Sequence, residues 1–288
     1  MINATLFSDP ACPWAYSESP ALRVIEWRYG DQIEWRLVVI GLTEHADEYA
    51  QRGYTVTRQA RGRLAFRRFG MPFTLAPKER LSGTARGCRA IVAARLLSPG
   101  SEWAVYRALQ LANFTTGLLL DDDEQIHAVL TGVEGVDPDA VRAAMDAPEV
   151  TAAYEADKAE SRSAAGSPTE MQGKAGNTDG AVRYTAPSVI FQADGARLEA
   201  GGFQAVEAYD VLIANLDPTL ERRDAPETPE RLLAAFPSGL TTQEVAACMT
   251  RSNDAVDRVA AEAALIDLLG EGRATRTPLG DDALWRAA

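Results

Sequence analysis

A cysteine and a proline stand together where a predicted strand gives way to a predicted helix. The apolar run of residues 4–7 precedes Cys12-Pro13, and a helical pattern of apolar residues follows it. Proline lacks an amide proton and has a fixed φ, so it suits the first position of a helix. We therefore predict a strand over residues 3–8, a helix over residues 13–29, and Cys12 at the N-cap between them.

The predicted N-cap position bears on the chemistry of the Cys12 thiol. The free amides of the first helical turn and the helix dipole favour an anion. A thiolate at such a position can have a pKa of roughly 3.5–7.5, against about 8.5 for a free cysteine. A buried, unreactive cysteine is the alternative interpretation. The pattern favours a reactive thiol, because Pro13 and Trp14 are unusual choices for plain core.

The chain continues with a second strand and then turns helical. Gly30-Asp31 ends the first helix, and residues 33–40 read as a strand. A strand, a helix and a strand in so short a stretch indicate a right-handed unit with parallel strands. Helical patterns dominate residues 44–165, and residues 166–180 are rich in the loop formers Gly, Ser, Thr and Asn.

Strand patterns return after that loop. Pro187 directly precedes an apolar β-branched run, which places it at the start of a strand. Asp194-Gly195 signals a hairpin turn, and residues 198–200 form the returning strand. A helical pattern over residues 204–214 then completes a second group of elements, two strands and a helix.

The turn Asp9-Pro10-Ala11-Cys12-Pro13-Trp14-Ala15-Tyr16 resembles the active-site turn of the DsbA-like branch of the thioredoxin superfamily. Its most similar groups are the FrnE-type proteins and the 2-hydroxychromene-2-carboxylate isomerases. The resemblance implies an α/β thioredoxin fold in two halves, residues 1–43 and 181–216, separated by a helical insertion and loop, residues 44–180. It also implies that the Ala186–Pro187 peptide bond is cis and faces Cys12.

The chain departs from the family pattern at one position. Redox members have Cys-Pro-Trp-Cys, and here Ala15 replaces the second cysteine. That second cysteine resolves a mixed disulfide by attack, which alanine cannot do. A further alternative makes Cys88 a remote resolving thiol.

Three functions remain compatible with a single active-site cysteine. In the first, a DsbA-like thiol oxidoreductase uses Cys12 for monothiol exchange or conjugation with a small thiol such as glutathione or mycothiol. In the second, a thiol-dependent isomerase or transferase uses Cys12 as its nucleophile on a small aromatic acid. In the third, the chain is a non-catalytic binding or dimerisation protein.

The resemblance also implies roles for the residues of the turn and of the facing peptide. The predicted catalytic residues are Cys12, Pro13, Trp14 and Pro187. The predicted substrate contacts are Ala186, Asp9, Tyr16 and Arg86. Capping of the turn is the alternative role for Asp9, and packing is the alternative role for Tyr16.

One stretch of the chain is strongly basic. Residues 58–89 carry nine Lys and Arg side chains and one acid, Glu79, in a chain of net charge −12. The basic residues are Arg58, Arg61, Arg63, Arg67, Arg68, Lys78, Arg80, Arg86 and Arg89. A charge run is usually a solvated face, but in this family the insertion covers the active-site thiol. We therefore predict that part of the run, including Arg86, steers an anionic small substrate.

Composition excludes several classes of protein. The chain of 288 residues is 46% hydrophobic and 24% charged, as is typical of a globular protein. It lacks an apolar run of about 20 residues and a signal-peptide pattern, so we expect no membrane partner and a cytoplasmic location. Three widely spaced cysteines and two histidines argue against a disulfide framework and a zinc site. We expect no metal and no bound cofactor.

The end of the chain reads as a separate unit. Residues 217–227 look like a linker, and residues 228–288 contain three helical patterns and a hairpin, which together resemble a winged helix. The helical patterns cover residues 229–235, 241–249 and 252–269. Six Arg against nine Asp and Glu give this unit a net charge of −3, and a phosphate backbone would be repelled. We predict a packing or homodimerisation module rather than a DNA-binding one.

Overall fold

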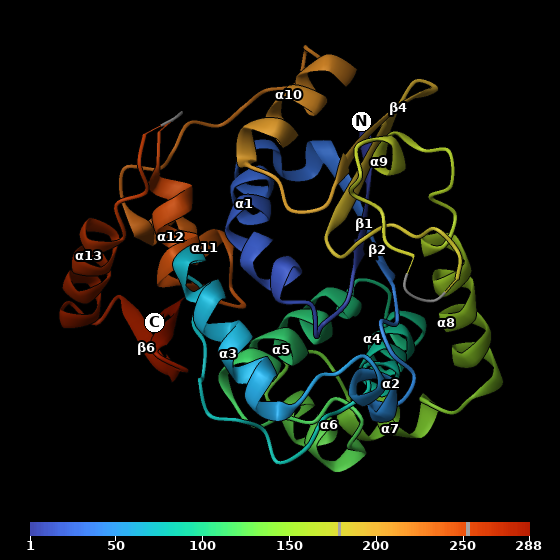
Figure 1. Ribbon diagram of the computed structural model, residues 1–288. Helices are drawn as coiled ribbons and strands as arrows, with labels where there is room; N and C mark the ends of the chain where they lie inside the picture. The colour runs from blue at the N-terminus through green and yellow to red at the C-terminus, as the bar shows by residue number, and fades with distance from the viewer. Residues whose placement is uncertain (178–179, 252–253) are drawn as a thin grey trace.

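The computed structural model describes residues 1–177, 180–251 and 254–288, and it shows a four-stranded sheet at the centre of an α/β protein (Figure 1). The strand order is β2-β1-β3-β4. β1 (Ile2–Ser8) pairs in parallel with β2 (Ile33–Val39), and Leu6 stands opposite Leu37. The helix α1 (Pro13–Tyr29) connects them. The predicted strand–helix–strand unit is therefore confirmed.

The second half of the sheet comes from a distant part of the chain. β3 (Ser188–Ala193) pairs antiparallel with β1, and β4 (Ala196–Gly201) pairs antiparallel with β3. Asp194 lies between these strands with φ 48°, which fits the predicted hairpin turn. The helix α10 (Val206–Leu216) then packs against β3 and β4.

Helices fill the insertion between the two halves, as the sequence predicts. They are α2 (Ala46–Gln51), α3 (Val56–Phe66), α4 (Ala85–Leu97), α5 (Ser101–Thr115), α6 (Asp123–Leu130), α7 (Pro138–Ala144), α8 (Pro148–Ser161) and α9 (Pro168–Met171). Short 3-10 turns follow α1 at Gly30–Gln32 and α3 at Arg67–Phe69. The largest core cluster joins side chains of α4 and α5 to those of β1 and β2. The insertion is thus part of the main hydrophobic core.

Three helices and a small sheet form the C-terminal unit. The helices are α11 (Pro229–Ala235), α12 (Thr242–Met249) and α13 (Arg258–Gly270). The strands β5 (Leu240–Thr241), β6 (Ala274–Leu279) and β7 (Asp282–Ala287) form a sheet of order β5-β7-β6. The last helix begins later than the predicted residue 252, and residues 252–253 lie outside the described part of the chain.

The C-terminal unit shares a hydrophobic core with α1. Val24 and Trp27 of α1 pack in one cluster with Leu233, Leu265 and Trp285, whereas Ile25 of the same helix faces the main core. In Figure 1 the C-terminal elements, coloured orange to red, lie on the side of α1 away from α8. α1 is therefore buried between the sheet and this unit.

A buried ion pair joins the C-terminal unit to the helices of the thioredoxin part. The guanidinium of Arg107 on α5 donates to both carboxylate oxygens of Glu244 on α12, at 2.8 Å each. Ser19 of α1 donates to the same carboxylate at 2.5 Å. The preceding segment is also held, since Arg223 N donates to the Arg28 carbonyl at 2.8 Å. Within the described residues, no helix has the length and apolar character of a membrane span.

Candidate functional site

Cys12 lies at the N-cap of α1, directly before the helix begins. Its backbone is extended (φ −80°, ψ 116°), and Pro13 is the first helical residue. The Cys12 thiol donates a hydrogen bond to the carbonyl of Ala186 at 2.9 Å. The Ala186–Pro187 peptide bond is cis. Four of the predicted site residues, Cys12, Pro13, Ala186 and Pro187, are therefore brought together from positions far apart in the sequence.

Burial reverses the expected shift in the pKa of Cys12. The residue is only 7% exposed and packs in one cluster with Phe7, Val38 and Tyr184. Burial raises the pKa of the thiol to about 11, and the amides of the first helical turn offset only part of this effect. The expected lowering of the pKa is wrong, because the sulfur is removed from water. The thiol is therefore protonated at neutral pH.

Asp9 fixes the turn that carries Cys12. Its carboxylate accepts hydrogen bonds from Ala11 N at 2.8 Å, Leu42 N at 2.9 Å and Thr84 Oγ1 at 3.0 Å. The residue is fully buried, which raises the pKa of its carboxyl even though these donors favour the charged form. The predicted substrate contact of Asp9 is therefore wrong, and the alternative, capping of the turn, describes its role.

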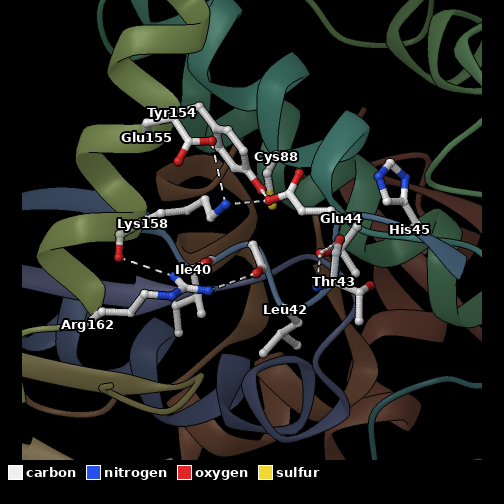
Figure 2. Close-up of polar contacts among 12 residues, drawn as sticks. Ile40, Leu42, Thr43, Glu44, His45, Cys88, Tyr154, Glu155, Lys158 and Arg162 are labelled. Carbon is white, nitrogen blue, oxygen red and sulfur yellow. Dashed lines mark hydrogen bonds and ion pairs between the residues drawn. The ribbon is translucent and has the colours of Figure 1, made fainter. Parts of the chain in front are cut away.

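The loop after β2 is held in place by α8. Arg162 donates to the carbonyl of Ile40 at 2.9 Å, and Glu44 accepts from Lys158 at 2.5 Å and from the hydroxyl of Tyr154 at 2.9 Å. Figure 2 shows these contacts around the loop, with Leu42 on its other side. Gly41 lies within the loop at φ +62°, so close to Tyr154 that a side chain would clash.

Cys88 is the second thiol near the turn. It is fully buried on α4, and its sulfur donates to Asp9 Oδ2 at 3.6 Å. Burial raises the pKa of this thiol well above its usual value. The cysteines are all free in the structure. Cys88 therefore has the features of an inert structural thiol rather than of a resolving one.

A cavity of about 670 Å³ opens beside the turn. Ala11 and Pro13, the two neighbours of Cys12 in the chain, line its wall. Six basic residues also line it, namely Arg52, Arg58, Arg61, Arg63, Lys78 and Arg183. Among the described residues, no acidic side chain lines the wall. The cavity next to the thiol is therefore electropositive and fits an anionic ligand.

Five aromatic side chains also line the cavity. They are Trp14, Tyr49, Tyr54, Phe66 and Phe114. Trp14 is 41% exposed and packs edge-on against Phe66 at 4.8 Å and Phe203 at 5.5 Å between ring centroids. Trp14 therefore lies at the rim, where it joins α1 to α3. A ligand in this cavity would meet both positive charge and aromatic surface.

Two predicted substrate contacts do not lie in the cavity wall. Tyr16 is fully buried, stacks on Phe114 at 4.6 Å and donates to the Pro72 carbonyl at 2.8 Å. Arg86 forms ion pairs with Asp123 and Asp146 and does not line the cavity. The structure therefore contradicts both predicted substrate contacts, and for Tyr16 the alternative role, packing, is the one observed. Tyr16 is a core residue, and the charge of Arg86 is already compensated.

The sequence did not point to several residues of the cavity. Tyr49, Asn113 and Arg183 come from three separate segments, and only the fold brings them to one wall. Arg58, Arg61, Arg63 and Lys78 do belong to the basic run that the sequence revealed. In the described part of the chain, no cluster of His, Cys, Asp or Glu could hold a metal ion.

Comparisons with known proteins agree with this architecture. The family model of the DSBA-like thioredoxin domain matches residues 4–186. Comparison with curated proteins gives no match. A putative protein disulfide isomerase from Nitrosomonas europaea is 16% identical, with 74% of this chain and 96% of that chain covered and a TM-score of 0.55.

Two further solved structures share the fold. The cytosolic disulfide reductase DsbM from Pseudomonas aeruginosa is 16% identical, with 75% of this chain and 100% of that chain covered and a TM-score of 0.53. A probable DsbA oxidoreductase from Streptomyces coelicolor is 18% identical, with 78% and 95% covered and a TM-score of 0.56. The match over residues 4–186, together with the thiol at the start of α1, shows that the chain belongs to the DSBA-like thioredoxin domain family.

Proposed function

We propose that the chain is a monothiol oxidoreductase in which Cys12 exchanges with a small anionic thiol or its disulfide. One observation carries the proposal. The Cys12 sulfur meets the carbonyl of Ala186 at 2.9 Å, directly beside a basic cavity that its chain neighbours line. Membership of the DSBA-like thioredoxin domain family supports it, as does the shared fold with a cytosolic disulfide reductase and a probable DsbA oxidoreductase.

The proposed reaction has two steps. In the first, the sulfur of Cys12 attacks a disulfide R–S–S–R and forms the mixed disulfide Cys12–S–S–R. The proton of the Cys12 thiol ends on the departing sulfur, which leaves as R–SH. In the second step, the sulfur of a second small thiol, R′–SH, attacks the R sulfur of the mixed disulfide, so that R–S–S–R′ leaves and the proton of R′–SH returns to Cys12. A small thiol must do this, because Ala15 has no sulfur.

The raised pKa of Cys12 sets a condition on this reaction. Without ligand, the Cys12 thiol donates a hydrogen bond to the carbonyl of Ala186 and stays protonated. A ligand sulfur that binds between Cys12 and Ala186 would displace this hydrogen bond. The Cys12 sulfur would then interact with the free amides at the start of α1, which favour the thiolate. We therefore propose that the thiol becomes reactive on ligand binding. The resting protein reacts slowly with reagents that do not occupy the cavity.

Small anionic thiols such as glutathione or mycothiol are the proposed co-substrates, and a cytoplasmic location, where they are abundant, is part of the proposal. A DsbM structure has been solved with GSH.

Membership of the FrnE-like branch is likewise proposed from the turn sequence. The C-terminal unit is proposed to be a winged-helix-like packing module, since α12 and α11 share their core with α1.

Mass spectrometry of the intact protein after incubation with glutathione disulfide tests the proposal. We expect one glutathione adduct on the natural chain, no adduct on the Cys12→Ser variant, and an unchanged adduct on the Cys248→Ser variant. Cys248 is a matched control, because it is also a buried free thiol but lies in the C-terminal core. An adduct that persists without Cys12, or no adduct at all, contradicts the proposal.

A non-covalent binding protein is the second candidate. The pKa of about 11 for Cys12 favours it, because so protonated a thiol is a weak nucleophile. In that case the Cys12→Ser variant binds the same small anions as the natural chain, and no adduct forms in either. The mass measurement above therefore separates the two candidates.

A further inference from the structure

Two buried cations line the inner wall of the cavity beside the active-site turn. Lys78 is 8% exposed and Arg63 is 6% exposed. Lys78 donates to Asn113 Oδ1 at 2.5 Å and to the carbonyl of Leu118. Arg63 donates to the carbonyls of Thr74 and Asn113 at 3.3 Å each. Both side chains therefore converge on Asn113.

The acceptors of these two cations are all neutral. Amide and backbone carbonyl oxygens accept their hydrogen bonds, and among the described residues no carboxylate forms an ion pair with either cation. Buried charges are normally paired, because removing a charge from water is costly. Two adjacent buried cations against an open cavity therefore leave positive charge that an anion would compensate.

Asn113 connects this pair to the thiol. Its side-chain amide donates to the carbonyl of Pro10 at 3.4 Å, two residues before Cys12. Asn113, Arg63 and Lys78 all line the same cavity as Pro13. A group bound at these cations therefore lies beside the turn that presents the sulfur.

We propose that Lys78, Arg63 and Asn113 form a carboxylate-binding subsite, and that the ligand of this protein is a carboxylate with an apolar or aromatic body. That the ligand also carries sulfur rests on the proposed function, whereas the carboxylate subsite does not. The exposed side chains Arg58 and Arg61 attract the anion to the mouth of the cavity. Tyr49 and Phe66 offer surface to its apolar part.

The protonation of Lys78 supports the assignment. Burial and, to a lesser extent, the neighbouring Arg63 lower the pKa of Lys78 to about 7, although Asp121 acts in the opposite direction. A bound carboxylate favours the charged ammonium, so binding takes up a proton near neutral pH. A site that only held Lys78 in the fold would show no such coupling to an added anion.

Equilibrium binding of two matched probes tests the subsite without any reaction at Cys12. The probes are phenylacetate and phenylacetamide, which share a phenyl ring and differ in charge. With the full chain carrying Cys12→Ser at pH 6, we expect phenylacetate to bind at least about tenfold more tightly than phenylacetamide, that is about 1.4 kcal/mol. Lys78→Met should remove most of that preference and leave phenylacetamide binding unchanged.

The matched control is Arg86→Gln, which removes one charge from the same basic run but outside the cavity wall. It should leave the preference for phenylacetate intact. Equal binding of the two probes, or an equal loss in Lys78→Met and Arg86→Gln, overturns the subsite. If Lys78→Met unfolds the chain, the exposed residue Arg61 supplies a second variant. Arg61→Gln must then still lower the affinity for phenylacetate at low salt.

A second measurement separates the subsite from the proposed function. Iodoacetate and iodoacetamide both alkylate a thiolate, and they differ mainly in that iodoacetate carries a negative charge. The ratio of their two rates therefore does not depend on the fraction of Cys12 that is thiolate. A ratio above that of free N-acetylcysteine, lowered by Lys78→Met, supports the subsite next to Cys12. If glutathione disulfide forms no adduct but phenylacetate is still preferred, the thiol function fails and the carboxylate subsite stands.

Discussion

Replacing Glu244 by glutamine tests how strongly the C-terminal unit is joined to the rest of the molecule. Glu244 is fully buried and accepts from Arg107, Ser19 and the backbone amide of Thr241. A glutamine keeps the shape but presents an amide nitrogen, which cannot accept from Arg107. The substitution therefore leaves a buried guanidinium without a compensating charge.

The expected loss of folding free energy can be derived from the structure in two ways. Breaking a buried ion pair by removal of one partner costs about 3–5 kcal/mol. Burial would raise the pKa of Glu244, but Arg107, together with Arg23 and Ser19, outweighs this effect and lowers the pKa from 4.5 to about 2. A difference of about 2.5 pKa units corresponds to about 3 kcal/mol of folding free energy at neutral pH. The two values agree, so we expect Glu244→Gln to lose about 3 kcal/mol.

The pH dependence has a definite sign. The folded-state pKa of Glu244 lies below its unfolded value, so the stabilisation is present above about pH 4.5 and is lost as the pH falls towards about 2. In the Glu244→Gln variant this acid-dependent part of the stability should be absent. The difference between the two proteins should therefore shrink as the pH is lowered.

Urea unfolding followed by tryptophan fluorescence measures the effect, because Trp27 and Trp285 lie in the shared core. Glu124→Gln is the control, since Glu124 pairs with Arg142 at the exposed surface, and it should leave the unfolding midpoint unchanged. A loss below about 1 kcal/mol for Glu244→Gln, the value expected of an exposed pair, would refute the reasoning.

Three further predictions follow from the site. The rate of Cys12 alkylation by iodoacetamide should rise with pH towards a midpoint near 11, because burial raises the thiol pKa; a midpoint below about 8.5 contradicts a buried resting thiol. Phenylacetate affinity, measured by titration, should fall as the pH rises through about 7, because Lys78 loses its proton there; a flat profile excludes Lys78 as the ligand group. Gly41→Ala should destabilise the chain by about 1–3 kcal/mol in urea, because φ is +62° and Tyr154 occupies the space; no loss would show that the loop can move aside.

Local sequence information was sufficient for the turn and its flanking elements. Proline after Cys12 and the apolar runs on either side define the strand, the N-cap and the helix, and the structure has them at the predicted places. The pKa of Cys12 could not be found in this way. It depends on Tyr184 and other residues far along the chain, which pack over the sulfur only in the fold.

The basic run, residues 58–89, also shows a property that the sequence reveals and one that only the fold reveals. Its charge was visible in the sequence, but the partners of each cation were not. Arg67, Arg80 and Arg86 pair with aspartates from other segments, whereas Lys78 and Arg63 meet only neutral oxygens. Long-range contacts decide which cations are left without a carboxylate partner, and the sequence alone could not separate Arg86 from Lys78 and Arg63.

The shared core on α1 has a consequence for how this chain can be shortened. The family match ends at residue 186, and a cut in the segment 217–227 would look natural from the sequence. Such a fragment would expose Val24 and Trp27 to water and leave Arg107 without its carboxylate. It would also release the segment after α3, where Asp281 holds Arg67. Removal of the C-terminal unit would therefore also loosen the segments that carry the cavity wall.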